Sequence, residues 1–579
     1  MPKIVELRAD RSLIRNNFDG YKLSLDPVPL LKQDLTTAPH KAVPNEDQYS
    51  LLHAELFSMQ NLLQVDPWAR TNSYFVNRLG EVMRTAYNES SGRAQTTKVV
   101  YCSPTRTPRV KGDYNYSMRF ISEKYCILCD GIKHMYLIDT NDRLKAAEWK
   151  QIAERHINEN GTDGAQVVRN FTLYDCRLDI SKEQKHISMA LGRVQRVDTS
   201  SVGSNHFMHL YWAKWVQTDN EWEFTIHDVL ESKGSLHYCA FEPRAESLII
   251  CSNHEYIFRS QKPAVDKGEK ETTNKPHLHD ENLEMKGFTW TQTDDDITIK
   301  FDVRDGKEKT DYNVKYASNK LTVKCCDDVL LDSELFARIE PDLTTWTIEN
   351  NYLQITLIKQ TTTLNWPSLI PDNVGPKETS DSSRENGIPI DQKPIANLEA
   401  PIEECDFPMG SIEEEIKIGR YNLCTKSVTH SILLGSSPPL FNTNLRPGFP
   451  NALAIRQDVD AGLWLQHYNP NKPDEWSLRH EGNLHAFGYI QASKQHRKFV
   501  DCSPDLNYAL ICESHRHVFL YKSNYDGADG LRNRSGPQVR IGKQHLITLE
   551  DTGEVLGLTT AEHAVTILTE LFVLHLQLN

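Results

Sequence analysis

The sequence contains no long apolar run. All of its apolar stretches are shorter than the roughly 20 residues that a membrane-spanning helix needs. Hydrophobic residues still make up 39% of the chain, which is enough to build a core. Residues 1–6 carry charges where a secretion signal needs an apolar segment. We therefore expect a protein of the cytoplasm and nucleus that does not associate with a membrane.

The sequence has fewer basic than acidic residues. The chain has 65 Lys and Arg against 79 Asp and Glu, which gives a formal net charge of -14. An acidic surface repels the phosphate backbone of nucleic acids and lowers the rate of encounter with them. We therefore expect no direct binding of nucleic acid.

Known catalytic and cofactor motifs are also missing. The sequence has no phosphate-binding glycine loop, no dinucleotide fingerprint, no His-Glu-x-x-His pair and no nucleophile elbow. Cys126 and Cys129 have the spacing of metal ligands, but positions i and i+3 of a strand point to opposite faces. No second cysteine pair accompanies them, so we interpret both as core residues of a strand. We expect no enzymatic activity, no cofactor and no metal site.

A dense strand pattern occupies residues 285–366. Ile297, Ile299, Phe301 and Val303 alternate with polar residues, which is typical of a strand with one buried face. The alternation recurs over 314–325 and 346–357, with turn residues between the runs. Several short strands at close spacing predict a compact antiparallel sandwich, with Trp346 in its core.

The same stretch resembles the CS domain of the NudC family. The matching segments, in order, are 288–293, 297–303, 331–335, 345–349 and 353–359. The ordered set is specific, although each segment alone is weak. The family pattern often ends in paired tryptophans, of which only Trp366 is present. The resemblance implies a seven-stranded sandwich that binds other proteins, as the small co-chaperones of the heat-shock machinery do, and it implies no catalysis.

Outside this stretch the chain repeats itself. Residues 243–258 and 504–519 share five residue types without a gap, namely Pro243, Ile250, Cys251, His254 and Phe258 in the first copy and Pro504, Ile511, Cys512, His515 and Phe519 in the second. A third copy lies at 127–136, with Cys129 and Tyr136 in register, and looser copies lie at 453–465 and 565–574. The blade missing from this series would include 187–194 and 206–212. Each copy predicts two strands around a tight turn, which is the central hairpin of a β-propeller blade.

Copies of this repeat lie on both sides of the CS-like stretch. We therefore predict an all-β fold in which a CS-type antiparallel β-sandwich is inserted into one β-propeller of about seven blades. The predicted parts are 1–260 and 416–579 for the propeller and 285–370 for the sandwich. Residues 261–284 and 371–415 are polar and have the composition of linkers, the second of them acidic. The segment 21–25 is expected to complete a blade with strands from the end of the chain.

Tryptophans suggest two candidate protein-binding surfaces. Trp366 follows the last predicted strand of the sandwich and precedes a linker, so it either packs on the edge of the sandwich or is an exposed anchor for a partner. We expect Trp366 to be the protein-binding residue. Aromatic residues also gather at 211–224, where Trp212, Trp215 and Trp222 either pack between blades or form an exposed patch.

These features lead to one functional hypothesis and one alternative. The first is a non-enzymatic co-chaperone or adaptor whose CS domain binds a client protein or a heat-shock chaperone and whose propeller binds a second partner, with propeller-containing proteins among the candidates. The alternative is a scaffold subunit of a cytoplasmic or nuclear assembly without chaperone activity.

Overall fold

The structure is a computed structural model that forms two compact units. One unit comprises Met1–Val265 and Cys405–Asn579, and the other comprises Asp266–Glu404. The residues that the structure describes are 2–578 without 15–17, 105–106, 146–147, 158–168, 182–183, 199–203, 220, 262–287, 294, 304–308, 327, 350–351, 362–365, 367–368, 371–414 and 524–540. Among the described residues, no helix is long and apolar enough to cross a bilayer.

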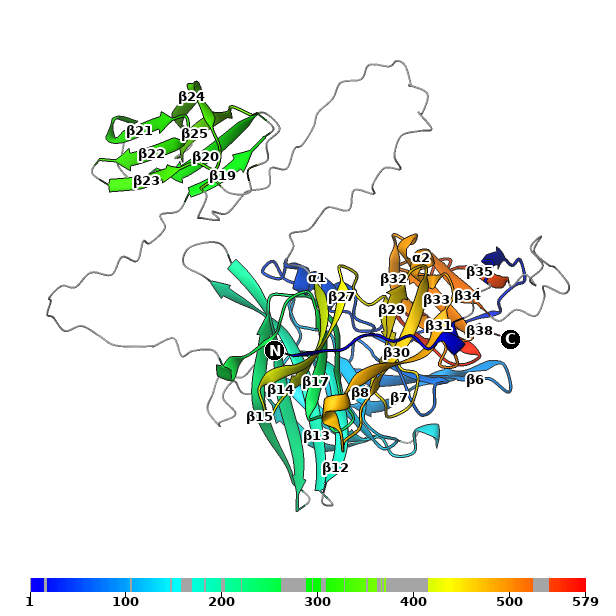
Figure 1. Cartoon of the computed structure of the whole chain (residues 1–579). Helices are drawn as coiled ribbons and strands as arrows, with labels where there is room; N and C mark the ends of the chain where they lie inside the picture. Colours follow the sequence, from blue (N-terminus) through cyan, green and yellow to red (C-terminus); the bar gives the residue numbers. More distant parts are fainter. Residues whose placement is uncertain are drawn as a thin grey trace. The chain divides into compact units, whose positions relative to one another are not determined.

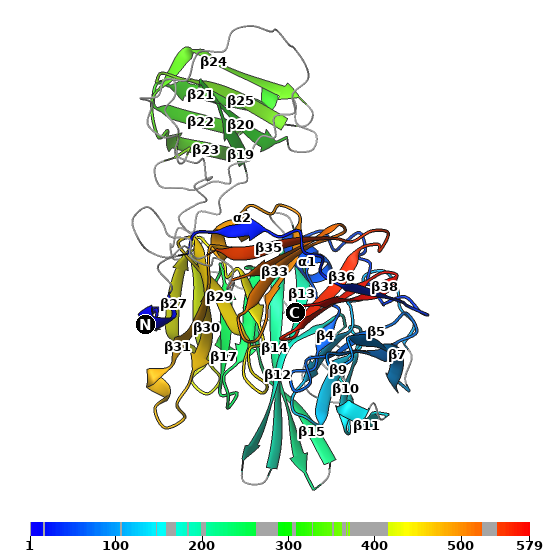
Figure 2. The same ribbon diagram turned by 90° about the vertical axis from the view of Figure 1, so that its right-hand side faces the viewer.

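The described residues of the first unit form seven sheets, which are the blades of a β-propeller (Figure 1). The first blade consists of β4 (Gln64–Val65), β5 (Asn72–Val76), β6 (Glu81–Asn88) and β7 (Arg93–Cys102). The second consists of β8 (Ser117–Phe120), β9 (Tyr125–Cys129), β10 (His134–Asp139) and β11 (Lys150–His156). The third consists of β12 (Thr172–Ser181), β13 (Gln184–Asp198), β14 (Ser204–Thr218), β15 (Glu221–Ser232) and β18 (Ile257–Phe258). Its long strands extend beyond the neighbouring blades (Figure 2).

The fourth blade is assembled from three distant parts of the chain. It consists of β16 (Leu236–Phe241), β17 (Ser247–Ser252), β26 (Ile416–Asn422), β27 (Ser427–Gly435) and β1 (Lys3–Ile4). The second unit is inserted between β17 and β26, which nevertheless pair directly, with Cys251 opposite Ile418. The insertion therefore divides a blade internally instead of separating two blades.

Three further blades complete the ring. The fifth consists of β28 (Phe441–Thr443), β29 (Ala452–Gln457), β30 (Asp460–His467) and β31 (Ser477–Leu484). The sixth consists of β32 (Arg497–Cys502), β33 (Tyr508–Glu513), β34 (His517–Lys522), β35 (Gly542–Thr548) and β2 (Tyr21–Leu23). The seventh consists of β36 (Val555–Thr560), β37 (Ala564–Thr569), β38 (Phe572–Gln577) and β3 (Leu30–Asp34).

A few short helices accompany the propeller strands. Two are α-helical, α1 (Leu51–Ser58) and α2 (Phe487–Ala492). The others are the 3-10 turns η1 (Arg11–Leu13), η2 (Arg143–Lys145), η3 (Arg259–Gln261) and η5 (Pro473–Glu475).

The central strand β9 shows how the sequence builds a blade. Cys126 packs on one side with Tyr74 and Tyr136, whereas Cys129 packs on the other side with Leu191. Both cysteines are fully buried, and burial raises the pKa of each thiol. The two side chains therefore fill the two cores that the blade shares with its neighbours, as strand alternation predicts.

The sequence repeat marks equivalent strands, with one exception. Cys512 lies on β33 and Cys251 on β17, and each strand is the second of its blade. After Cys512 the chain turns into β34, which pairs with β33 as predicted. After Cys251 the predicted hairpin is wrong, because Ile257–Phe258 pairs with β15 of the third blade. The place of the expected strand is taken by β26, which lies beyond the insertion.

The described residues before position 35 contact four successive blades. β1 pairs in parallel with β27, and β2 pairs in parallel with β35. Between them, the backbone N–H of Asp10 donates to Nδ1 of His480 in the fifth blade. The ring closes at β3, which pairs with β38 and places Leu31 opposite His575. The segment at Tyr21 does join a late strand, as expected, but the strand that completes a four-stranded blade is β3.

Removal of β3 is predicted to damage the ring more than removal of the two strands before it. A chain without residues 2–35 leaves β38 as an unpaired edge, and such an edge promotes aggregation. A chain without residues 2–26 loses β1, η1 and β2 but keeps β3, and it serves as the control. We expect the longer deletion to reduce soluble yield and the thermal midpoint clearly more than the shorter one. Equal behaviour of the two proteins would contradict the role of β3 in ring closure.

The second unit is a two-sheet sandwich. One sheet has the order β19 (Phe288–Gln292), β20 (Asp296–Asp302), β25 (Tyr352–Lys359) and β24 (Ile339–Glu349). The other consists of β21 (Tyr312–Ala317), β22 (Lys320–Cys325) and β23 (Asp328–Glu334), preceded by the 3-10 turn η4 (Lys309–Asp311). Ile297, Ile299 and Phe301 point inward, as their alternation predicts. The predicted fold class is confirmed for both units, whereas the linker boundaries fall largely outside the described residues.

Candidate functional site

The structure places Trp366 inside the CS sandwich. Its side chain is 0% exposed and packs in the same core as Trp290. The ring centroid lies 5.9 Å from that of Phe336. The expectation of an exposed anchor is therefore wrong, and Trp366 is a packing residue. A contribution of Trp366 to partner binding stays a prediction, and it would require the ring to leave the core.

One side chain holds Trp366 in this position. The Nε2 of Gln292 donates to the carbonyl of Trp366 over 2.8 Å, and the backbone N–H of Trp366 donates to Oε1 of Gln292 over 2.9 Å. The buried ammonium of Lys359 donates to the same Oε1 over 2.9 Å. The segment after the last strand is thereby fixed to the end of β19, far from it in the sequence.

Trp346 is less buried than the sequence predicts. Its ring packs against the core from a partly exposed position on β24. The Nζ of Lys309 lies 4.9 Å from its ring centroid, which is within the range of a cation–π contact. Trp346 therefore packs on the core as predicted, but only from its margin, and the fully buried tryptophans of the described sandwich residues are Trp290 and Trp366.

The sandwich presents a lysine-bearing face on its three-stranded sheet. Lys315 of β21 and Lys320 and Lys324 of β22 are exposed and lie on the same side. Lys320 forms an ion pair of 3.0 Å with Asp332 on β23, and its hydrogen bond lowers the pKa of that carboxyl. Exposed Glu334 of β23 lies opposite Lys320. The excess of positive charge is therefore at Lys315 and Lys324, where this face suits an acidic segment of a partner protein. We name Lys315, Lys320 and Lys324 the lysine face.

The propeller encloses a central cavity of about 1030 Å³. Residues of the innermost strand of every blade line it. α1 lies beside the start of β16, because Glu55 bonds to Ser235, the residue before that strand, and Leu56 and Met59 also line the cavity. The cavity is therefore bordered by a helix at one end.

A loop from the fifth blade crosses the other end of the cavity. This loop, residues 444–451, joins β28 to β29. Asn444 accepts from Nη2 of Arg70 of the first blade over 2.9 Å, and the carbonyl of Gly448 accepts from Nη1 of Arg177 of the third blade over 2.5 Å. The carbonyl of Asn451 accepts from the hydroxyl of Tyr238 of the fourth blade over 2.6 Å. The loop thus ties three other blades together across the channel.

Buried acids in the channel wall are shifted toward their neutral forms. Burial raises the pKa of Asp175, although Arg177 and the N–H of Phe241, which donates to Oδ2 over 2.7 Å, oppose the shift. Burial likewise raises the pKa of Asp501, which accepts from the hydroxyl of Thr560 over 2.9 Å. The arginines of the wall keep their charge, and Arg177 partly offsets the effect of burial on Asp175.

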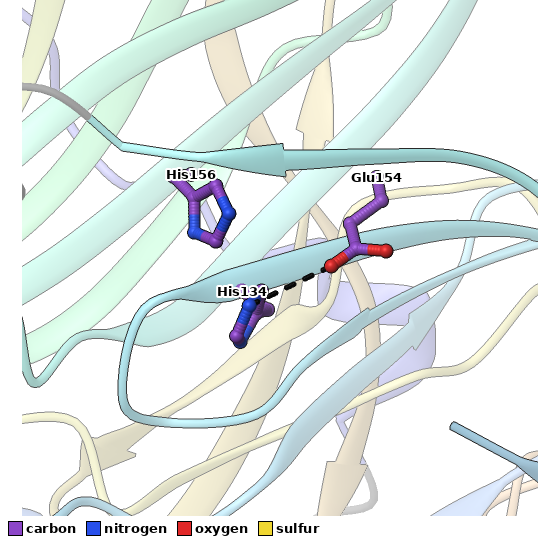
Figure 3. A group of neighbouring side chains, drawn as sticks. All are labelled: His134, Glu154 and His156. Atoms are coloured by element: carbon purple, nitrogen blue, oxygen red, sulfur yellow. Dashed lines mark ion pairs between the residues drawn. The ribbon is translucent and has the colours of Figure 1, made fainter. Parts of the chain in front are cut away.

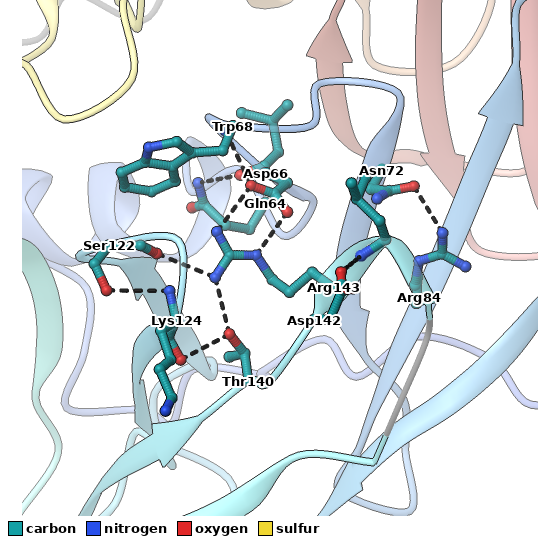
Figure 4. Close-up of polar contacts among 12 residues, drawn as sticks. Gln64, Asp66, Trp68, Asn72, Arg84, Ser122, Lys124, Thr140, Asp142 and Arg143 are labelled. Carbon is teal, nitrogen blue, oxygen red and sulfur yellow. Dashed lines mark hydrogen bonds and ion pairs between the residues drawn. The ribbon is translucent and has the colours of Figure 1, made fainter.

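A buried ion pair joins the first two blades beside this wall (Figure 4). The Nε and Nη2 of Arg143 donate to Asp66 over 2.7 and 3.2 Å, and Nη1 donates to Thr140 over 2.8 Å. The guanidinium also lies 4.6 Å from the ring centroid of Phe120, which lines the cavity. The same network holds Trp68, whose backbone N–H donates to Oδ1 of Asp66 over 3.0 Å. These bonds tie the chain that follows β4 to η2 of the second blade.

The aromatic cluster of the third blade is a packing feature. Trp212, Trp215 and Trp222 are all buried. Trp212 contacts Phe241 of the fourth blade, whereas Trp215 and Trp222 pack in the core shared with the second blade. The alternative of an exposed aromatic patch is therefore wrong.

Comparisons with known proteins agree with this division. The CS domain family matches residues 286–359. NudC domain-containing protein 1 of Mus musculus is 29% identical over 97% of both chains, and that of Xenopus tropicalis is 26% identical over 97% of both. Among solved structures, the nuclear movement protein of E. cuniculi aligns with 14% of this chain and 96% of its own, at 23% identity and a TM-score of 0.13.

The WD40 domain of SCAP from fission yeast aligns with 95% of this chain and 98% of its own, at 7% identity and a TM-score of 0.29. The resemblance to the NudC family is confirmed: the chain contains a CS domain and is similar over nearly its whole length to NudC domain-containing protein 1.

Proposed function

We propose that this chain is a non-enzymatic co-chaperone or adaptor of the cytoplasm and nucleus. Its CS domain would bind a client protein or a chaperone, and its propeller would bind a second partner. The observation that carries the proposal is the CS domain matched at 286–359, which has its own closed core and an exposed lysine face. CS domains and propellers are typically interaction modules, so the combination supports a role in binding proteins.

The geometry of the propeller favours binding on its outer surfaces. The loop 444–451 ties blades across the channel, and α1 lines its other end. A partner segment would have to displace both to pass through. We therefore assign the second partner to the faces and rim of the ring, and not to the channel.

Suppression of aggregation by the isolated CS unit, residues 266–404, tests the proposal. All members of its core lie within this unit, so it is expected to fold alone. We expect it to reduce light scattering from thermally denatured citrate synthase. Lys315→Glu combined with Lys324→Glu should remove most of this effect, because the face then repels acidic client segments. Lys300→Glu, on the opposite sheet, is the matched control and should behave as the wild type.

The alternative, a scaffold subunit without chaperone activity, predicts a different outcome. In that case the CS unit and both variants leave aggregation unchanged, and the full chain forms a stable stoichiometric complex through the propeller alone. Circular dichroism of each variant confirms that the sandwich is folded. Activity of the double variant equal to that of the wild type would remove the lysine face from the binding surface.

A further inference from the structure

The outer hairpin of the second blade gathers three metal-ligating side chains that belong to none of the sites described above. His134 begins β10, and Glu154 and His156 lie near the end of β11. His134 is directly opposite His156 in the antiparallel pairing, and Glu154 is two residues before His156. All three side chains therefore lie on one face of the hairpin, as Figure 3 shows.

The ligand atoms of the three side chains are close to one another. One nitrogen of each histidine and one oxygen of Glu154 all lie within 4.8 Å of each other. The Nε2 of His134 is 3.6 Å from Oε1 of Glu154, and the two imidazole centroids are 4.4 Å apart. Ligands at 2.0–2.2 Å from a tetrahedral metal are separated by roughly 3.3–3.6 Å, so small rotations of His156 bring the set to this geometry.

A buried carboxylate orients His134 for this role. The Oδ2 of Asp130 lies 2.9 Å from Nδ1 of His134. Its Oδ1 accepts from the backbone N–H groups of Ile132, Lys133 and His134 over 2.8, 2.8 and 2.9 Å. Asp130 is therefore held as an acceptor, so that Nδ1 of His134 carries the proton and Nε2 presents its lone pair to Glu154 and His156. A carboxylate behind a histidine is the usual support of a metal-bound imidazole.

The two ligands on β11 are accessible to solvent. His134 is 2% exposed, but His156 is exposed and Glu154 is partly exposed. An ion can therefore enter from the surface and reach a histidine that is already fixed. Two imidazoles and one carboxylate are a ligand set of borderline softness, which suits Zn²⁺ and leaves a fourth position for water.

We propose that His134, Glu154 and His156 form a Zn²⁺ site on the outer edge of the second blade, with Asp130 as the positioning residue. The ion joins β11, the outermost strand of this blade, to the buried strand β10. The competing explanation is a simple pairing of His134 with Glu154 that needs no metal. Their separation of 3.6 Å exceeds the usual length of a hydrogen bond, and the pairing gives no role to His156.

Zinc binding by the full-length protein tests the proposal. After treatment with a chelator, the protein is titrated with Zn²⁺ in competition with a fluorescent zinc indicator. We expect His156→Ala and Glu154→Gln each to lose one tight equivalent of zinc. Asp130→Asn should weaken this equivalent by roughly 10–100-fold, as loss of a supporting carboxylate does. A rise of the thermal midpoint with zinc should occur in the wild type and disappear in His156→Ala.

Two controls keep the test decisive. His515→Ala removes an exposed turn histidine of another blade and should leave zinc binding unchanged. His156 is exposed, so His156→Ala should fold even if a change at buried His134 does not. Wild-type affinity and stoichiometry in both His156→Ala and Glu154→Gln would place the zinc elsewhere and overturn the proposal. Absence of a tight equivalent in the wild type would leave only the His134–Glu154 pairing.

Discussion

Trp366→Ala is expected to remove a large part of the stability of the CS sandwich. The side chain is fully buried against Trp290 and Phe336, and its loss leaves a large cavity. Such a truncation costs about 3–5 kcal/mol, whereas a domain of this size has a total stability of about 5–15 kcal/mol. Urea denaturation of the unit 266–404, followed by tryptophan fluorescence, measures the effect.

Trp346→Ala is the matched control for this substitution. Its ring is partly exposed and rests against the core, so its loss should lower the free energy of unfolding by clearly less. Gln292→Ala should fall between the two, because it releases the backbone of Trp366 without removing the ring. An unfolding midpoint of Trp366→Ala close to that of the wild type would show that the ring is not part of the core in solution.

Arg420→Met is expected to destabilise the propeller at the divided blade. Arg420 on β26 donates from Nε and Nη2 to Glu242 over 2.9 and 3.3 Å, and both side chains are almost completely buried. The pair joins the chain before the insertion to the chain after it. Removing one partner leaves a buried charge without its counter-charge and costs about 3–5 kcal/mol. Thermal unfolding of the full-length protein, monitored by circular dichroism, measures the loss.

The loss should depend on pH in a defined direction. Burial already raises the pKa of Glu242, and Arg420 opposes that shift. Without Arg420 the folded pKa rises further above the unfolded value, so the folded state binds the proton more tightly and gains stability as the pH falls. Arg420→Met should therefore recover part of its stability at pH 5 relative to pH 7.5. Arg420→Met with Glu242→Gln removes the charge and should show neither the full loss nor the pH dependence; a full loss in this double variant would contradict the explanation.

Strand alternation predicts much of this structure, and its limits are physical. It identifies which side of a strand faces a core, so the inward residues of β20 and the opposed cysteines of β9 follow from the sequence alone. It does not tell how deeply a side chain lies, because burial depends on the strand's neighbours. Trp346 alternates correctly but lies partly exposed on β24, and Trp366 lies outside any strand yet is fixed in the core by Gln292.

Long-range pairing explains the remaining differences. The strand expected after Cys251 adds to the neighbouring blade because β26 returns from beyond the insertion to occupy its place. The cluster of His134, Glu154 and His156 depends on the register of β10 against β11, which no local pattern specifies. The spacing Glu154-x-His156 on a strand was the available signal, and it gains meaning only once His134 is placed opposite.

The pairing of β3 with β38 constrains how the chain is made on the ribosome. β3 is among the first strands to be synthesised, and its partner β38 is the last. A nearby hydrogen bond, from Nδ1 of His545 to the backbone carbonyl of Asp26, shows the scale of such separations, because it spans 519 positions of the chain. At a synthesis rate of roughly 5–20 residues per second, the interval between the synthesis of β3 and that of β38 is tens of seconds or more. During that time the early strand edges stay open, and β17 must wait for β26 until the CS unit has been translated. A chain truncated before β38 cannot close the ring, so premature termination near the end should yield a protein that quality control removes.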